Sequence, residues 1–386
     1  MGLYLVTGGA GFIGSNFIRY LINEEKNSKF IVYDSLTYSG LPFNLSPFLK
    51  EDNIVVVLFG KDYFKFERSK IKSYKKIYSK KELEDLIKKF ISKEDRLLLI
   101  VASITNLEPL KVVMTFIDNL FHFAAETHVD RSIMYPHRFV FTDVVGTYFL
   151  LYAFKEINGQ RGKFIHISTD EIYGEIIEGK AKEDSPLYPS SPYSASKAGA
   201  DRLVYSFYKT YGLPVIIVRP SNVFGERQFP EKFIPLSIMK VLMKEKIPIY
   251  GDGKQIRSWI YQEDAVRGIY LIFKKGKIGE EYNLPGNTEL ENIKVAEIIC
   301  DLAGVEKEKF IEFLKDRPAH DRRYSLDGTK LFSLGFKYSW NFNDAIKKTF
   351  EFYKQNFRFY KKLLKEKKVK KFMDVWYSKL KGVDEV

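Results

Sequence analysis

The chain has 386 residues, of which 45% are hydrophobic and 16% aromatic, so it can bury a large core and is not a disordered protein. Its length fits one large domain or two. The formal net charge of +13 comes from two stretches, because 61–96 has 13 basic and 7 acidic residues and 354–381 has 11 basic and 2 acidic residues, while the rest is nearly neutral.

Short apolar runs alternate with amphipathic segments over the first 219 residues. The runs that predict buried strands lie at 3–7, 30–34, 97–102, 120–124, 163–168 and 215–219. The amphipathic patterns between them predict helices at 12–24, 138–157 and 193–211. Continuous apolar strands that alternate with helices indicate a parallel sheet covered on both faces. We therefore expect an α/β fold with a doubly wound parallel sheet.

This alternation is interrupted once and ends after residue 219. Residues 51–96 form a basic segment, helical in composition over 61–93, which we interpret as an insertion. After Arg219, proline and glycine become frequent, which is typical of a loop-rich ligand-binding lobe. We predict a Rossmann-type domain over 1–220, a smaller substrate-binding lobe over 221–350 and a basic, aromatic extension over 351–386.

Neither metal nor disulfide chemistry is indicated. Cys300 has no second cysteine to pair with, and the five histidines show no metal-binding spacing. The first residues lack the pattern of a signal peptide, and the longest apolar runs are far short of the roughly 20 residues that span a bilayer. We expect a soluble cytoplasmic protein with no metal and no membrane span.

A glycine-rich turn predicts a dinucleotide site. The first predicted strand leads into Gly8, Gly11 and Gly14 and then into a helix, whose amino end offers N–H groups to a pyrophosphate. Asp34 ends the second predicted strand 20 residues after Gly14, where a carboxylate binds an adenosine ribose. A carboxylate there repels a 2′-phosphate, so the pattern favours NAD over NADP.

Two further motifs indicate proton transfer. Tyr193 and Lys197 lie one helical turn apart, so the ammonium group can lower the pKa of the phenol and let it accept a proton from an alcohol. Asp170 and Glu171 follow the strand at 163–168, at the edge of a parallel sheet where ligands bind. Adjacent carboxyl groups that point in different directions can serve as an acid and a base.

Taken together, these motifs resemble the extended short-chain dehydrogenases/reductases and, more narrowly, the dTDP-glucose 4,6-dehydratases. The resemblance rests on the glycine turn, on 34–38 (DSLTY), 122–131 (HFAAETHVDR), 168–174 (STDEIYG) and 193–197 (YSASK), and on shorter matches within 219–257 and 316–324. It covers 1–50 and about 97–350. The Thr169-Asp170-Glu171 triplet is the specific element, because epimerases and decarboxylases of this family lack the Asp-Glu pair.

The resemblance implies a role for each of these side chains. Tyr193, assisted by Lys197, takes the proton from the glucose O4 while C4 gives a hydride to NAD. Glu171 removes the C5 proton, Asp170 protonates the departing C6 hydroxyl, and Thr169 hydrogen-bonds the C4 oxygen. The hydride then returns to C6, so the reaction is redox-neutral and gives a 4-keto-6-deoxy sugar.

The resemblance also implies two sets of binding residues. Those expected at NAD, besides Tyr193 and Lys197, are Gly8, Gly11, Phe12, Ile13, Gly14, Asp34, Ser35, Leu36, Thr37, Ser103, Ile104, Ala124, Ala125, Glu126, Thr127, Thr142 and Val223. Those expected at the nucleotide sugar are His128, Asn222, Lys232, Phe233, Pro248, Tyr250, Arg257, Asn292, His320 and Tyr324, with the residues between the last two. An arginine and a lysine suit a diphosphate, and an aromatic wall suits a base.

The chain departs from the family pattern at three positions. The Gly-Asp-Ile that follows the third strand of the family corresponds either to 60–62 or to 102–104, and the 19 residues between Ser103 and His122 favour the second. Ser103 then replaces the aspartate that contacts adenine. Asp143 stands where the family has asparagine, and Ser258 where it has aspartate.

Two other functions stay open at the level of sequence. A related enzyme could act on UDP-glucose, because the contacts that distinguish the base are not legible in the sequence. A retired dehydrogenase scaffold could instead bind a polyanion or a membrane surface through the basic, aromatic tail, although a helix with one packed face is the favoured interpretation of that tail. We expect no nucleic-acid partner, and the resemblance implies a homodimer through the helices at 138–157 and 193–211.

Overall fold

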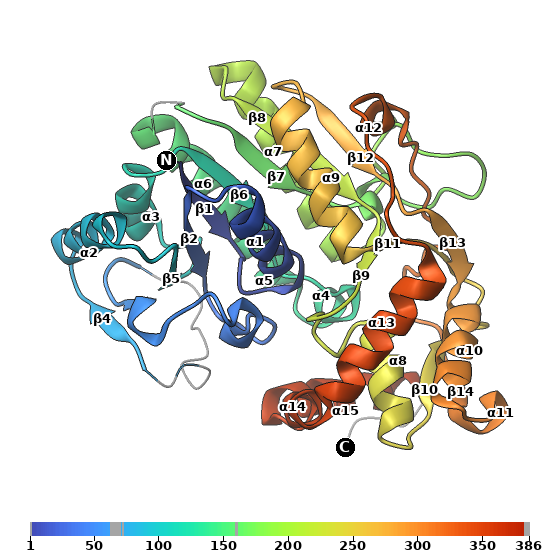
Figure 1. Ribbon diagram of the computed structural model, residues 1–386. Coiled ribbons are helices and arrows are strands. Elements are labelled where there is room, and N and C mark those ends of the chain that lie inside the picture. The colour runs from blue at the N-terminus through green and yellow to red at the C-terminus, as the bar shows by residue number, and fades with distance from the viewer. Residues whose placement is uncertain (1, 62–70, 72, 159–160, 382–386) are drawn as a thin grey trace. The chain divides into compact units, whose positions relative to one another are not determined.

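Figure 1 shows a computed structural model of the chain, which describes residues 2–61, 71, 73–158 and 161–381. The chain divides into two compact units. The first, called the sheet unit here, takes Met1–Thr169, Pro192–Arg219 and Val266–Tyr282, and the second, called the lobe unit, takes Asp170–Ser191, Pro220–Ala265 and Asn283–Val386. Each unit therefore combines separate stretches of chain, whereas the domain limits expected from the sequence are continuous ranges.

A nine-stranded sheet with the order β12-β8-β7-β6-β1-β2-β5-β3-β4 forms the centre of the sheet unit. Its strands are β1 (Leu3–Thr7), β2 (Lys29–Asp34), β3 (Ile54–Val57), β4 (Lys75–Ile77), β5 (Leu97–Val101), β6 (Asn119–His122), β7 (Phe164–Ile167), β8 (Val215–Pro220) and β12 (Glu281–Leu284). Every neighbouring pair from β8 to β4 is parallel. The predicted parallel α/β sheet is confirmed.

Helices cover both faces of this sheet, as the alternation of side chains along each strand requires. On one face, the ring of Phe121 in β6 lies 4.7 Å from that of Phe17 and 5.0 Å from that of Phe273. These two partners come from α1 (Phe12–Glu24) and α9 (Gln262–Lys275). On the other face, Leu120 belongs to a buried cluster with residues of α2 (Lys80–Ser92), α3 (Leu107–Met114), α6 (Gly146–Ala153) and α7 (Pro192–Tyr211).

The basic segment 51–96 is built into the edge of the sheet. β3 pairs with β5 and β4 pairs with β3, and Leu83, Ile87 and Phe90 of α2 are buried in the shared core. β5 pairs directly with β2, so residues 102–104 follow the strand that lies next to β2 in the sheet. This is the one of the two candidate positions for the Gly-Asp-Ile motif that the spacing to His122 favours. The part of the predicted helical stretch that falls on 62–70 and 72 lies outside the described residues.

The lobe unit combines small sheets with helices. One sheet has the order β13-β11-β9 and the other pairs β10 with β14. The elements are β9 (Asn222–Phe224), β10 (Ile247–Tyr250), β11 (Ile256–Tyr261), β13 (Thr288–Glu291), β14 (Ile311–Leu314), α8 (Phe233–Leu242), α10 (Asn292–Ala303), α11 (Lys307–Phe310), α12 (Thr329–Ser333), α13 (Phe342–Gln355), α14 (Phe357–Leu364) and α15 (Lys367–Leu380). Across the described residues, no helix combines the length and the apolar character needed to cross a bilayer.

The basic tail is helical and packs one face on the lobe unit. Tyr360 of α14 and Phe372 and Trp376 of α15 are buried, while most lysines of these helices are exposed. In Figure 1 the two helices are red and lie near α13 and α8. The packed helix is therefore the interpretation of the tail that agrees with the structure.

Candidate active site

The glycine turn between β1 and α1 has the close contacts expected of a dinucleotide site. Gly8 has a φ of +68°, and a Cβ atom there would lie 2.6 Å from the amide nitrogen of Ala124. A Cβ atom on Gly14 would lie 2.5 Å from the carbonyl oxygen of Gly8. Only glycine fits these two places, so the loop after β6 and the first turn of α1 can pack closely against the glycine turn.

Asp34 connects this turn to the loop after β2. Its carboxylate accepts hydrogen bonds from the backbone N–H of Ala10 at 3.0 Å and of Leu36 at 2.8 Å. Leu36 has a φ of +47°, which is uncommon for a residue other than glycine. The buried carboxylate thus joins the glycine turn, which is predicted to bind the pyrophosphate, to the loop after β2.

The loop after β6 is held by Tyr38, which lies in the loop after β2. The hydroxyl of Tyr38 donates to the carbonyl oxygen of Thr127 at 2.8 Å, and the guanidinium carbon of Arg131 lies 3.8 Å from the centre of the Tyr38 ring. His128, which ends this loop, has a φ of +101°. Strained backbone of this kind persists where neighbouring contacts hold it and is frequent at binding sites.

Ser103 and Ile104 have local partners. The hydroxyl oxygen of Ser103 lies 2.6 Å from the hydroxyl oxygen of Thr105. It also accepts a hydrogen bond from the backbone N–H of Thr105 at 3.1 Å. Ile104 is buried, with its side chain 2.6 Å from where a Cβ atom on Gly146 would lie. The turn after β5 is therefore held by contacts of Ser103 with Thr105 and of Ile104 with Gly146, and Ser103 is the residue that stands where the family has an aspartate.

Lys197 is buried in the sheet unit, and it follows Tyr193 by one turn of α7, so the two residues lie on the same face of that helix. Its amine donates to the carbonyl oxygen of Ile167, at the end of β7, at 2.7 Å. Burial lowers the pKa of Lys197, while the negative charges of Asp143 and Asp201 oppose that shift. Tyr193 is partly exposed and its ring contacts that of Phe139, whereas Lys197 is buried.

Asp143 is a residue of this site to which the sequence analysis gave no role. It lies in a short π-helical stretch, Val140–Val145, and is buried. One carboxylate oxygen accepts from the backbone N–H of Glu126 at 2.7 Å, and the other accepts from the hydroxyl of Ser196 at 2.7 Å. Burial raises the pKa of Asp143 to about 7, against the opposing charge of Lys197. The signal in the sequence was a carboxylate in the otherwise uncharged run FTDVVG.

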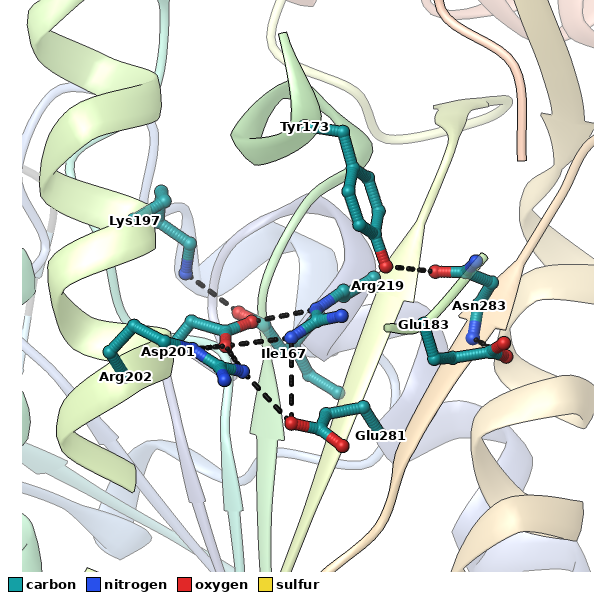
Figure 2. Close-up of polar contacts among 9 residues, drawn as sticks. All are labelled: Ile167, Tyr173, Glu183, Lys197, Asp201, Arg202, Arg219, Glu281 and Asn283. Atoms are coloured by element: carbon teal, nitrogen blue, oxygen red, sulfur yellow. Dashed lines mark hydrogen bonds and ion pairs between the residues drawn. The ribbon is translucent and has the colours of Figure 1, made fainter. Parts of the chain in front are cut away.

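A buried ion pair fixes the next turn of α7 (Figure 2). The guanidinium of Arg219, in β8, donates to both carboxylate oxygens of Asp201 at 2.9 and 3.0 Å. Burial alone would raise the pKa of Asp201, but Arg219 and Arg202 hold it below its usual value. Because Asp201 lies one turn after Lys197, this pair fixes the position of the lysine along α7.

The lobe unit holds the second carboxyl of the predicted chemistry. Burial raises the pKa of Glu171, and the positive charges of Arg317, Arg257 and Lys232 oppose that shift. Glu171 is only partly exposed to solvent. Three cations therefore act on one carboxyl group, which follows Asp170 directly in the chain. Arg317 was not among the predicted site residues, although it lies in the matched stretch 316–324.

Arg257 is held by its own set of contacts. Its guanidinium donates to the carbonyl oxygen of Asp321 at 3.0 Å and lies 4.4 Å from the centre of the Tyr324 ring. The hydroxyl of Tyr324 donates to the carboxylate of Asp321 at 2.8 Å. The loop 316–324 therefore fixes the cation that the resemblance assigns to a diphosphate.

The predicted site residues separate cleanly between the two units. All residues predicted at the cofactor except Val223 lie in the sheet unit, as do Thr169 and His128. All residues predicted at the nucleotide sugar except His128 lie in the lobe unit, together with Asp170 and Glu171. Each unit thus contains most of one set of binding residues, and one of the boundaries between the units falls between Thr169 and Asp170.

Comparisons with known proteins agree on one family. The family model described as GDP-mannose 4,6 dehydratase matches residues 52–349. The dTDP-glucose 4,6-dehydratase 1 of Escherichia coli K12 is 39% identical over 376 residues, which cover 91% of this chain and 92% of that protein.

Two further relatives extend this agreement. A trifunctional UDP-glucose 4,6-dehydratase, epimerase and reductase of Arabidopsis thaliana is 39% identical over 91% of this chain and 47% of its own length. The crystal structure of a dTDP-glucose 4,6-dehydratase from Streptomyces venezuelae with NAD and TYD bound is similar with a TM-score of 0.79 and 36% identity, over 94% of this chain and 99% of that one. The chain belongs to the family of nucleotide-sugar 4,6-dehydratases within the short-chain dehydrogenases/reductases.

Proposed function

We propose that this chain is an NAD-dependent dehydratase that converts dTDP-glucose into the 4-keto-6-deoxy sugar. The observation that carries the proposal is the environment of the Glu171 carboxyl group. Burial raises the pKa of this group, and three cations of the kind that bind a diphosphate act on it. Such a group can remove a proton from the sugar of a bound nucleotide sugar. Membership of the family and the ligands of the S. venezuelae structure support this function.

The sheet unit suits NAD as the cofactor. The glycine turn leads from β1 directly into the amino end of α1, which is the arrangement that binds a pyrophosphate, and the Asp34 carboxylate favours an unmodified ribose over a 2′-phosphate. NAD, when bound, accepts one hydride from the sugar and returns it, so the dehydration is redox-neutral overall.

Three residues act at the sugar O4 in this proposal. Tyr193 takes the proton of the O4 hydroxyl, and the positive charge of Lys197, held below it by Ile167, favours that transfer. Thr169 donates a hydrogen bond to the C4 oxygen as it becomes a carbonyl. That carbonyl makes the C5 hydrogen acidic.

The elimination uses the two carboxyl groups. Glu171 takes the C5 proton, and the electron pair of that C–H bond forms the double bond between C5 and C6. The C6–O bond breaks, and Asp170 gives its proton to the departing hydroxyl, which leaves as water. Return of the hydride to C6 and of a proton to C5 completes the 4-keto-6-deoxy sugar.

UDP-glucose is a second candidate substrate. The observation that favours it is the 39% identity to the A. thaliana protein, whose name includes UDP-glucose 4,6-dehydratase. The two substrates differ in the methyl group of the base and in the sugar of the nucleoside. The diphosphate and glucose are the same, so the reaction and its residues would not change.

We also propose that two chains associate through the helical segments at 138–157 and 193–211 of the sheet unit. Large apolar side chains are exposed there at Val140, Phe141, Tyr148 and Tyr211, with exposed fractions of 51, 39, 41 and 48%. A cluster of exposed apolar residues on neighbouring helices marks an interaction surface. The lone, buried Cys300 suits a reducing compartment, so we propose the cytoplasm as the location.

The function is tested by incubating the purified chain with NAD and either dTDP-glucose or UDP-glucose. We expect a product lighter by one water in the mass spectrum. For dTDP-glucose we expect a kcat/KM at least about tenfold higher, because one methyl group in a fitted pocket is worth that much. No product from either substrate would contradict the proposal, and a faster reaction of UDP-glucose would establish the second candidate.

The pH profile of kcat should fall on its acidic side because Glu171 becomes protonated there. The base works only when ionised, and its pKa lies above the usual value, so kcat should fall as the pH drops through that raised pKa. Arg317→Gln removes a charge that holds this pKa down, so this acidic limb of the profile should move up by roughly one pH unit.

The matched control for this shift is Arg358→Gln, since Arg358 is exposed in α14 and is not among the charged groups that act most on the pKa of Glu171. Its pH profile of kcat should coincide with that of the unmodified chain. An acidic limb that stays in place in Arg317→Gln would show that Glu171 is not the titrating base.

The dimer is tested by light scattering at micromolar concentration. We expect the mass of two 45.1-kDa chains for the unmodified protein and of one chain for Tyr148→Glu, because a charge placed in an apolar interface is costly to desolvate. Tyr188→Glu is the control, since Tyr188 is 73% exposed in the lobe unit and should leave the mass unchanged. An unmodified chain that scatters as a monomer would refute the dimer.

A further inference from the structure

The last two helices extend beyond the part of the chain that the family model matches. That match ends at residue 349, whereas α14 and α15 span Phe357–Leu364 and Lys367–Leu380. α15 buries Val369, Phe372, Trp376 and Leu380, which lie three or four residues apart on one face. This helix therefore packs on the rest of the lobe unit through one apolar face.

The carboxyl end of α15 is fixed beside β14. The backbone N–H of Lys315 donates to the carbonyl oxygen of Leu380 at 3.2 Å, and the amine of Lys381 lies 3.2 Å from the carboxylate of Glu312. β14 in turn pairs with β10, with Tyr250 opposite Leu314. α15 is thus tied to the sheet that carries Tyr250.

Trp376 makes a direct bond to Tyr250. Its indole N–H donates to the phenol oxygen at 2.9 Å, and the indole is buried. An indole N–H can only donate, so the Tyr250 oxygen is the acceptor of this bond. The ring of the next residue, Tyr377, lies 6.5 Å from that of Tyr250. α15 therefore contacts Tyr250 through both its hydroxyl and its ring.

The same tyrosine connects α15 to the loop 316–324. The ring of His320 meets that of Tyr250 edge-on at 6.1 Å, and its Nδ1 lies 2.6 Å from the carboxylate of Asp316. The side-chain amide of Gln255 donates to the other oxygen of Asp316 at 3.1 Å. Burial lowers the pKa of His320 to about 4, so the imidazole is neutral near pH 7 and offers a flat, uncharged ring.

We propose that α15 builds one wall of the subsite for the nucleotide base, with Trp376 as the positioning residue that holds Tyr250 against the base. The inference rests on the proposed function, since Tyr250 and His320 belong to the residues that would hold the nucleotide. The ligand class is a pyrimidine nucleoside diphosphate. A tyrosine held in one orientation loses less freedom on binding, so Trp376 acts on affinity and leaves the chemistry at C4, C5 and C6 alone.

The test compares Trp376→Phe with Val369→Ala in the full chain. Val369 lies two turns earlier on the same buried face, so its variant weakens the packing of α15 without removing the bond to Tyr250. For Trp376→Phe we expect the Kd of dTDP, measured by calorimetry, and the KM for dTDP-glucose to rise about 3- to 10-fold, with kcat within twofold. Val369→Ala should bind dTDP as the unmodified chain does.

A second measurement keeps the proposal open to refutation if Trp376→Phe folds poorly. Tyr250→Phe keeps the ring and removes the acceptor of the same bond, so on its own it should raise the Kd of dTDP about 3- to 10-fold, and unchanged binding by this variant would overturn the proposal. Where Trp376→Phe also folds, combining the two changes should weaken dTDP binding no further than Tyr250→Phe alone. Additive losses, or unchanged dTDP binding by a folded Trp376→Phe, would overturn the role of Trp376. An equal loss in Val369→Ala would overturn it too. If the unmodified chain neither binds dTDP nor dehydrates dTDP-glucose, the proposed function fails instead.

Discussion

Burial of the Lys197 amine is the constraint on which the organisation of the sheet unit depends. A buried ammonium group is costly unless hydrogen bonds and opposite charges compensate it. The carbonyl oxygen of Ile167 supplies the bond, and Asp143 and Asp201 supply the charges. Each of these is fixed in turn, Asp143 by Ser196 and Glu126 and Asp201 by Arg219. The strand ends and α7 are therefore arranged around one cation.

In the lobe unit the functional group has the opposite charge, and neighbouring charges again oppose the effect of burial on its pKa. This group is a carboxyl, so burial raises the pKa of Glu171 and cations lower it. If Arg257, Arg317 and Lys232 also bind the diphosphate, one set of charges both holds the substrate and tunes the base. In the proposed reaction, Tyr193 and Lys197, which act in the oxidation, belong to the sheet unit, and Glu171, which acts in the elimination, belongs to the lobe unit.

Most of the central sheet could be predicted, because its strands are continuous apolar runs and its first helix is cleanly amphipathic. β1 and α1 were predicted at their exact limits. The place of β4 in the sheet could not be predicted, since a lysine-rich strand of three residues gives no periodic signal. The place of β3 could not be either, because this apolar strand follows β2 in the chain but pairs with β5 in the sheet. The site residues could be named from short motifs, but the contacts of Asp143 and of Trp376 join residues 17 to 126 positions apart, which no local pattern reveals.

The separation of oxidation from elimination is the central claim, and rapid mixing of dTDP-glucose with two conservative variants tests it most directly. Glu171→Gln keeps the size of the side chain but cannot accept the C5 proton. Reduced nicotinamide should therefore accumulate in its absorbance band and decay about 10²- to 10⁴-fold more slowly than in the unmodified chain. Tyr193→Phe should give no such band, because the O4 proton stays in place. A Glu171→Gln variant that turns over at the unmodified rate, or rapid reduction in Tyr193→Phe, would contradict the account.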